Sequence, residues 1–273
     1  MSMPVPVMGA SLPAKDVGQF RDWILEGQRD LEIDDPFYSD RLDGDWQPLV
    51  AQVRHTLAGY TGRIGIHGPT ESLPIWCDDR RVSEIVQLRL RQGLAFAKAL
   101  DATHMVLHSP FTFFGNLHVV HTYGTDLTKE IQIIHQTLGE IVADAEAQEC
   151  MIVIEVCSDL HTRPLIELVR SFQSKYVQLS LDVGHARIMQ EYGGPTPDQW
   201  VRDAADLLAH VHIQDTDGLY DHHWAPGDGS INWYAFFDAV KHLNHMPRMI
   251  MEVAQPSLIM RGFDYLRTRG YVV

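Results

Sequence analysis

The chain has little of what several common protein classes require. Its three cysteines, Cys77, Cys150 and Cys157, form neither a CxxC pair nor an even-numbered disulfide framework, which suits a reducing compartment. Acidic residues outnumber basic ones by 36 to 22, giving a formal net charge of −14. Because proteins bind phosphate backbones through lysine and arginine, this balance argues against a nucleic-acid partner.

Membrane, targeting and nucleotide-binding signatures are also missing. No uncharged apolar run reaches the roughly 20 residues that span a bilayer, and the opening MSMPVPVMGA lacks the basic region of a signal peptide. We therefore expect a cytoplasmic protein with no membrane partner. The sequence contains no GxGxxG fingerprint, no GxxxxGKS/T loop and no GxSxG elbow, which disfavours dinucleotide, P-loop and serine-hydrolase chemistry.

The sequence does contain a regular series of short apolar segments rich in Val, Ile, Leu and Met. They lack the polar alternation of a half-exposed sheet, as is typical of parallel strands buried on both faces. We expect strands at 5–10, 30–33, 63–67, 103–108, 151–155, 177–182, 207–211 and 248–252. Segments with helical spacing lie between and after them, at 14–26, 45–59, 79–100, 126–148, 161–172, 197–205, 230–243 and 256–269.

This alternation predicts an α/β protein with a parallel sheet and right-handed crossovers. The 273 residues contain no low-complexity linker, and their number is close to the size of one (β/α)8 barrel, about 250 residues. We therefore predict a single domain, residues 1–273, folded as a (β/α)8 barrel. An open doubly wound sheet is the alternative.

Most of the predicted strands end in, or run directly into, a residue that can bind a metal. These residues are His67, His108, Glu155, Asp182, His212 and Glu252. In a (β/α)8 barrel the C-terminal ends of the strands converge on one mouth, so the side chains would be neighbours. Carboxylates gathered there without cations would be costly to bury, and imidazole mixed with carboxylate suits Zn, Mn, Fe or Co better than Ca. The pattern favours a catalytic metal site.

Two further segments bring polar side chains to the same mouth. His185 follows Asp182 in LDVGHA and is expected in the loop after the strand, while Asp182 as the N-cap of a short turn is the less favoured interpretation. After His212 comes DHHWAPGDG, in which Asp221 and His223 precede a tight Pro-Gly loop. Both segments extend the candidate metal site beyond the strand ends.

The motifs IHGP, VLHSP, IEV, LDVGH, HVHIQD, DHHWAPGDGSINW and IMEV together resemble the xylose isomerase-like barrel superfamily. This superfamily contains sugar isomerases and epimerases as well as the endonuclease IV type of apurinic endonuclease. The ketose epimerase branch implies one divalent metal, two glutamates that act as acid and base, and substrate contacts from His185 and the position of His223, where those enzymes usually have arginine. The metal ligands that the resemblance implies are Glu155, Asp182, His212 and Glu252, with Glu155 and Glu252 as the catalytic pair.

The endonuclease IV branch implies three zinc ions instead. By this resemblance His67, His108 and Glu155 would hold one ion, and His185, Asp221 and His223 another. The third would be held by Glu155, Asp182, His212 and Glu252. Against this branch, Thr70 replaces the aromatic residue that follows the family's His-Ser-Pro, and the acidity of the chain is wrong for a duplex partner.

The leading hypothesis is a divalent-metal-dependent isomerase or epimerase that acts on a sugar or other small polyhydroxylated substrate through an ene-diolate, with one to three Zn, Mn or Co ions per chain. Trp224, Trp76 and Phe111 could stack against the substrate or pack at the rim. The alternatives are a trinuclear zinc phosphoesterase and a metal- or sugar-binding barrel without turnover. The sequence leaves open the exact substrate, homo-oligomer formation, and whether the segment 110–125, with His118 and His121, closes over the mouth.

Overall fold

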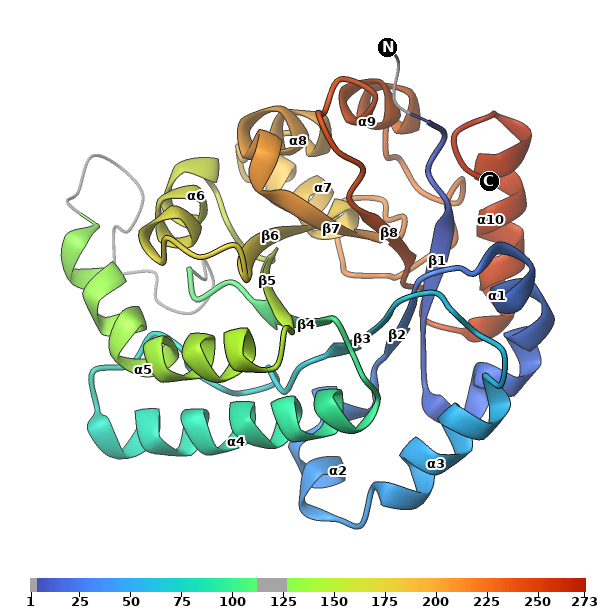
Figure 1. Ribbon diagram of the computed structural model, residues 1–273. Helices are drawn as coiled ribbons and strands as arrows, with labels where there is room; N and C mark the ends of the chain where they lie inside the picture. The colour runs from blue at the N-terminus through green and yellow to red at the C-terminus, as the bar shows by residue number, and fades with distance from the viewer. Residues whose placement is uncertain (1–3, 112–126) are drawn as a thin grey trace.

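Parallel strands close into a barrel in the order of the chain in the computed structural model, which describes residues 4–111 and 127–273. Figure 1 shows the strands at the centre with the helices around them. The barrel closes where Met8 and Ala10 of the first strand pair with Met249 and Met251 of the last. The predicted α/β barrel is therefore confirmed. Its strands are β1 (Met8–Leu12), β2 (Leu31–Ile33), β3 (Ile64–His67), β4 (His104–His108), β5 (Met151–Val156), β6 (Val177–Asp182), β7 (Leu208–Ile213) and β8 (Arg248–Met251).

The outer layer consists of helices whose apolar faces cover the barrel. Several of them begin at side-chain caps that the sequence supplies; Asp79, for example, accepts hydrogen bonds from the backbone of Arg81 and Val82, and Thr196 accepts one from Gln199. The α-helices are α1 (Arg21–Gly27), α2 (Ser39–Asp43), α3 (Gln47–Thr56), α4 (Arg80–Ala99), α5 (Thr128–Ala147), α6 (Thr162–Ser171), α7 (Val183–Glu191), α8 (Pro197–Ala204), α9 (Trp233–Val240) and α10 (Ile259–Thr268). Short 3-10 turns are η1 (Ala14–Phe20), η2 (Asp35–Phe37), η3 (Ala205–Leu207) and η4 (Pro256–Leu258).

The clearest differences from the sequence prediction concern the first strand, the segment before α1, and the helices α2 and α7. The first strand covers Met8–Leu12 rather than 5–10, because the pairing with β2 begins at Ala10 and extends to Leu12. The segment predicted as one helix over 14–26 starts as the 3-10 turn η1 and becomes α-helical only at Arg21. The helices α2 and α7 were not expected at all. Across the described ranges, no helix has the length and apolarity of a transmembrane span.

The interior of the barrel is polar at its centre. Side chains of Glu32, His104, Ser180, His210 and His212 point into it and are fully buried. The apolar core therefore lies mainly between the strands and the surrounding helices. This arrangement leaves the inner space to hydrogen-bonding groups, which must satisfy one another because water is excluded.

Gly65 on β3 makes room for one of these imidazoles. A Cβ atom at this position would lie 1.8 Å from Cε1 of His104, a separation that neither group can accommodate without displacement. The barrel interior thus requires a residue without a side chain opposite His104. This requirement concerns packing, because Gly65 does not have a positive φ angle.

We expect Gly65→Ala to destabilise the protein by about 3 kcal/mol or more, because the buried His104 ring and its partners must move. The matched control is Gly139→Ala in α5, where no described atom lies within 4 Å of the added Cβ. This control should stabilise the protein by about 0.5–1 kcal/mol through helix propensity. Urea unfolding of both variants measures the difference. Equal stability of the two variants would contradict the packing argument.

Candidate metal centre

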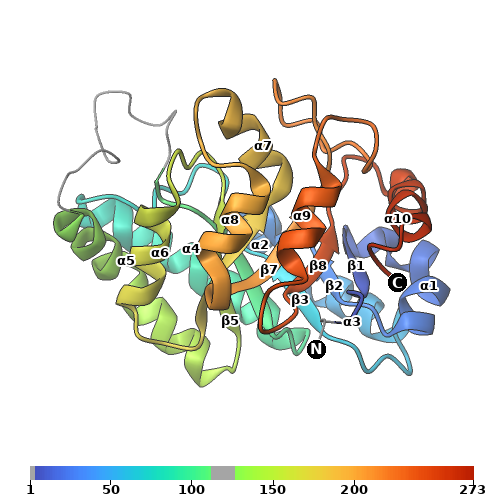
Figure 2. The same ribbon diagram turned by 90° about the horizontal axis from the view of Figure 1, so that it is seen from above.

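The C-terminal ends of the strands surround a cavity of about 240 Å³. Figure 2 shows that α7 and the loop after β7 rise on the same side of the barrel. Carboxylates and imidazoles dominate the lining, together with the aromatic rings of Phe37 and Tyr38. The lining residues are Asp34, Phe37, Tyr38, His67, His108, Glu155, His185, Asp221, His223 and Glu252.

A first group of potential ligands consists of His67, His108 and Glu155, at the ends of β3, β4 and β5. Nε2 of His67 and Nε2 of His108 lie 3.6 and 3.3 Å from Oε2 of Glu155. This oxygen is buried and has no hydrogen-bond partner among the described residues. A buried carboxylate oxygen that faces two imidazole nitrogens without hydrogen bonding to either fits a shared cation.

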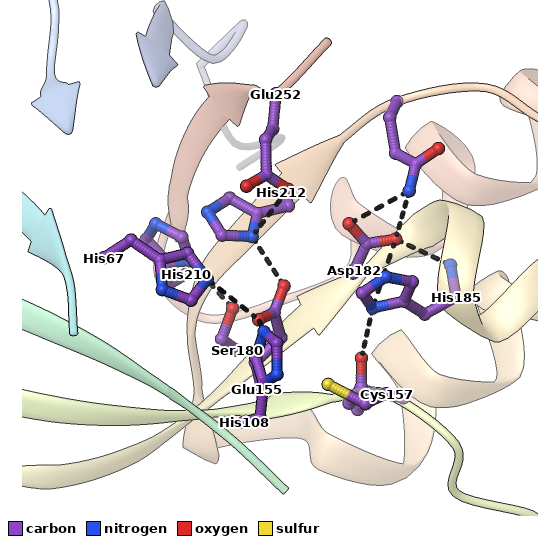
Figure 3. Close-up of polar contacts among 12 residues, drawn as sticks. His67, His108, Glu155, Cys157, Ser180, Asp182, His185, His210, His212 and Glu252 are labelled. Carbon is purple, nitrogen blue, oxygen red and sulfur yellow. Dashed lines mark hydrogen bonds and ion pairs between the residues drawn. The ribbon is translucent and has the colours of Figure 1, made fainter. Parts of the chain in front are cut away.

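A second group consists of Glu155, Asp182, His212 and Glu252. Nδ1 of His212 lies 2.6 Å from Oε1 of Glu155 and 3.3 Å from Oε2 of Glu252. Figure 3 shows His212 directed at Glu155, with Asp182 beside them. Glu155 thus has one oxygen toward the first group and the other toward the second, as a carboxylate that bridges two ions would.

A third group consists of His185, Asp221 and His223. Oδ2 of Asp221 lies 3.1 Å from Nε2 of both histidines. All nine ligands predicted from the sequence therefore fall into three groups. Within each group the donor atoms lie within 4.8 Å of one another, which is compatible with bonds of about 2.0–2.3 Å to a common ion. That metal occupies them stays a prediction.

Gln214 connects the second and third groups. Its amide nitrogen lies 3.3 Å from Oδ1 of Asp182 and 2.7 Å from Oδ1 of Asp221, and its carbonyl accepts the backbone N–H of His223 at 3.1 Å. The last contact holds His223 at φ +48°, an uncommon conformation for a residue with a side chain. Gly184 provides the space, because a Cβ there would lie 2.3 Å from Cδ of Gln214.

Charge interactions among these groups shift the pKa values of their side chains even without metal. Burial raises the pKa of Glu155, but the adjacent His212 outweighs it and holds that pKa well below its usual range. Burial lowers the pKa of His212, yet Glu252, Glu155 and Glu32 together raise it well above the ordinary value. Protons shared between imidazoles and carboxylates therefore occupy the positions where cations would bind, so that metal and protons compete for these sites.

The structure corrects the expected setting of His185. This residue lies in the first turn of α7 and not in a loop, and its backbone N–H donates to Oδ1 of Asp182 at 2.6 Å. Asp182 therefore caps α7, the interpretation that the sequence disfavoured, and belongs to the second group at the same time. The helix begins directly after β6, so both side chains are fixed by regular structure.

The aromatic side chains near the substrate space also differ from expectation. Trp224 stacks on His222 with centroids 3.9 Å apart. Neither it nor Trp76 or Phe111 is among the described residues that line the cavity. The aromatic wall is instead formed by Phe37 and Tyr38. Of the segment 110–125, for which the sequence leaves closure over the mouth open, residues 112–125, with His118 and His121, lie outside the described residues.

Several residues of the site were not predicted from the sequence, because they do not stand at the last position of a predicted strand. Glu32 lies within β2, and Asp34 and Phe37 follow it in the acidic and aromatic segment DDPFY. Burial and the adjacent Asp35 raise the pKa of Asp34 to about 7. Asp215 organises the loop after β7. It accepts hydrogen bonds from the backbone of Gly227 and Ile231 and from Nε1 of Trp233.

Comparison with known proteins gives a family and a set of similar folds. A family model described as xylose isomerase-like TIM barrel matches residues 26–269. The protein MJ1311 of Methanocaldococcus jannaschii is 23% identical over 195 residues, covering 68% of this chain and 62% of that protein. The chain thus spans less than two thirds of this relative's length.

Two solved structures share the fold along almost the whole chain. A D-tagatose 3-epimerase-like protein superposes with a TM-score of 0.75 at 21% identity, covering 96% of each chain. The 3-keto-D-glucoside 4-epimerase YcjR from E. coli superposes with a TM-score of 0.69 at 17% identity, covering 96% of this chain and 99% of that one. The names of both similar structures refer to sugar epimerases.

The imidazoles of the site predict a pH dependence of stability for the metal-free protein. Burial lowers the pKa of His223, but Asp221 and Glu252 outweigh it and raise that pKa to about 9, above the ordinary 6.5. Stabilisation from this group is therefore complete below pH 6.5 and lost as the pH rises through 9. We expect the free energy of unfolding in EDTA to fall by about 2 kcal/mol between pH 7 and 9 from His223 alone.

Urea unfolding at the two pH values measures this loss, and His185 and His212 act in the same direction because their pKa values are also raised. The variant His223→Gln should show a smaller fall than the wild type. A free energy of unfolding that is constant or increases over this range would contradict the assignment.

Proposed function

Since the chain belongs to the xylose isomerase-like TIM barrel family, we propose that it is a divalent-metal-dependent isomerase or epimerase acting on a sugar or other small polyhydroxylated substrate. The observation that carries the proposal is the second group: Glu155 and Glu252, from well-separated strands, both approach Nδ1 of His212 and both line one small cavity. Two carboxylates at one ion are suited to proton removal and return.

The ion would be Zn, Mn or Co, held by Glu155, Asp182, His212 and Glu252. When bound, it would polarise a substrate carbonyl and the adjacent hydroxyl and so acidify the C–H bond between them. Glu155 and Glu252 would take and return the proton at the carbon, leading through an ene-diolate to the isomer. The close approach of Oε1 of Glu155 and Oε2 of Glu252 to Nδ1 of His212, and the raised pKa of His212, are the features that fit such an ion.

The walls of the cavity fit a small polyol. Phe37 packs edge-on against His67 with centroids 4.9 Å apart, and with Tyr38 it offers an apolar surface to the C–H face of a sugar. The volume of about 240 Å³ lies below the range of about 300–1,000 Å³ that is usual for drug-sized ligands. Within the described lining residues there is no lysine or arginine, so a substrate anion would be paired by a bound metal or by the imidazoles of His185 and His223, whose pKa values are raised.

A trinuclear phosphoesterase is the second candidate. It is favoured by the first and third groups, His67–His108–Glu155 and His185–Asp221–His223, which assemble donors beyond those that one ion needs. Several metals could generate hydroxide and hold a phosphate for attack. The net charge of −14 opposes a nucleic-acid substrate.

Metal content distinguishes the two candidates. We expect protein purified without a chelator or a histidine tag to contain one or two equivalents of metal per chain, with manganese or cobalt supporting activity. Elemental analysis measures the number. Near three equivalents, chiefly zinc, would contradict the leading proposal and favour phosphoester hydrolysis, and phosphodiester cleavage would then be tested.

Replacing either glutamate tests the reaction itself. Glu155→Gln and Glu252→Gln should each reduce kcat by about 10²–10⁴-fold, because an amide cannot accept the substrate proton. The assay is isomerisation of a panel of ketoses, with incorporation of deuterium from D₂O at the exchanging carbon. The control is Glu149→Gln, an exposed glutamate just before β5, at the opposite end of the strand from Glu155. Wild-type activity in the Glu155 variant would overturn the assignment.

A further inference from the structure

Beneath the metal centre, four side chains meet in the interior of the barrel, and only one of them, His212, also belongs to the proposed metal site. Glu32 of β2 lies at their centre. Oε2 of Glu32 is 3.1 Å from Nε2 of His104 and 3.2 Å from Nε2 of His210, and Oε1 is 2.9 Å from Nε2 of His212. All four residues are fully buried. One carboxylate therefore faces the same ring nitrogen of three histidines.

The residue that contacts the other ring nitrogen of His104, Nδ1, shows which nitrogen of this imidazole carries the proton. The guanidinium of Arg248 contacts Nδ1 of His104. An arginine can only donate, so Nδ1 must accept with its lone pair. In a neutral imidazole the proton then resides on Nε2, which donates to Glu32 at 3.1 Å. His104 thus has no lone pair on Nε2 to offer to a cation.

His210 repeats the arrangement with a different outer partner. Its Nδ1 lies 2.8 Å from Oγ of Ser180, a hydroxyl that can donate. Nε2 then carries the proton and lies 3.2 Å from Oε2 of Glu32, close enough for an ion pair but without the geometry of a hydrogen bond. The cluster of Glu32, His210 and His212 has a spacing that a metal could use. The directions of these contacts instead favour an anion that receives N–H groups.

His212 is the third imidazole and the one that reaches the metal centre. Its Nε2 donates to Glu32, while Nδ1 faces the carboxylates of Glu155 and Glu252. Ionised carboxylates only accept. With one proton held at Nε2, the lone pair of Nδ1 and the oxygen of Glu155 point at the same position, 2.6 Å apart. Two acceptors at that separation need either a proton shared between them, as the raised pKa of His212 provides in the metal-free protein, or a metal ion that both of them bind.

We infer that Glu32 is a positioning residue, which anchors a proton on Nε2 of His212 and so directs the lone pair of Nδ1 into the metal centre. A histidine ligand commonly has its second nitrogen fixed by a carboxylate in this way, which sets the tautomer and raises the basicity of the ligand. His104 and His210 hold the carboxylate in place from the other side. The inference rests on the metal site of the proposed function, although not on the reaction proposed there.

The experiment compares metal binding by the whole chain and by two variants. Glu32→Gln should weaken the binding of Co²⁺ and Zn²⁺ by about 10–100-fold, measured by competition with a chelator. Ser180→Ala is the control, because it removes the outer partner of His210 but leaves the contact between Glu32 and His212. Its affinity should stay within about threefold of the wild type, since loss of an indirect partner changes ligand basicity little.

A spectroscopic measurement on the wild type makes the test independent of how the variants fold. In the zinc-bound protein, ¹⁵N NMR of the histidine rings should show His212 protonated at Nε2 and metal-bound at Nδ1. Metal bound at Nε2, a folded Glu32→Gln variant with wild-type affinity, or an equal loss in Ser180→Ala would each overturn the inference. A wild-type protein that binds no divalent metal would overturn the proposed function as well, so the two failures are distinguishable.

Discussion

The structure depends on satisfying carboxylates that are cut off from water inside the barrel. Glu32 and Glu155 are both fully or almost fully buried, and an unpaired charge there would cost far more than one apolar contact contributes. Imidazoles from β3, β4 and β7 supply the compensation. The register of the strands is therefore constrained by polar pairs across the barrel as well as by the hydrogen bonds between neighbouring strands.

This constraint explains the distribution of side-chain sizes around the centre. An imidazole is bulky, so the residues that face the histidines are small: Gly65 lies opposite His104, and Ser180 lies beside His210. Apolar bulk is moved outward to the layer between strands and helices, where Leu90, Ile134 and Trp200 are buried. The barrel thus has a hydrogen-bonded polar centre, surrounded by an apolar layer between the strands and the helices.

Much of the fold and of the candidate site could be predicted from the sequence, because strand ends in a closed barrel must converge. This topological fact placed His67, His108, Glu155 and their partners at one mouth, where the structure has them. Glu32 was missed because periodicity does not show which interior residue of a strand faces the axis. The helix α7 was missed because it follows β6 without a turn, and the stacking of Trp224 on His222 depends on a loop conformation that local sequence does not specify.

The hydrogen bonds of the Gln214 amide limit how the mouth of the barrel could be redesigned. A primary amide nitrogen carries two hydrogens, and in this chain they are directed at carboxylates of two different groups, Asp182 on the strand and Asp221 on the loop. The loop after β7 is therefore not an interchangeable module. A transplanted loop of the same length, without an acceptor at position 221, would leave half of that amide unsatisfied and loosen the strand carboxylate along with it.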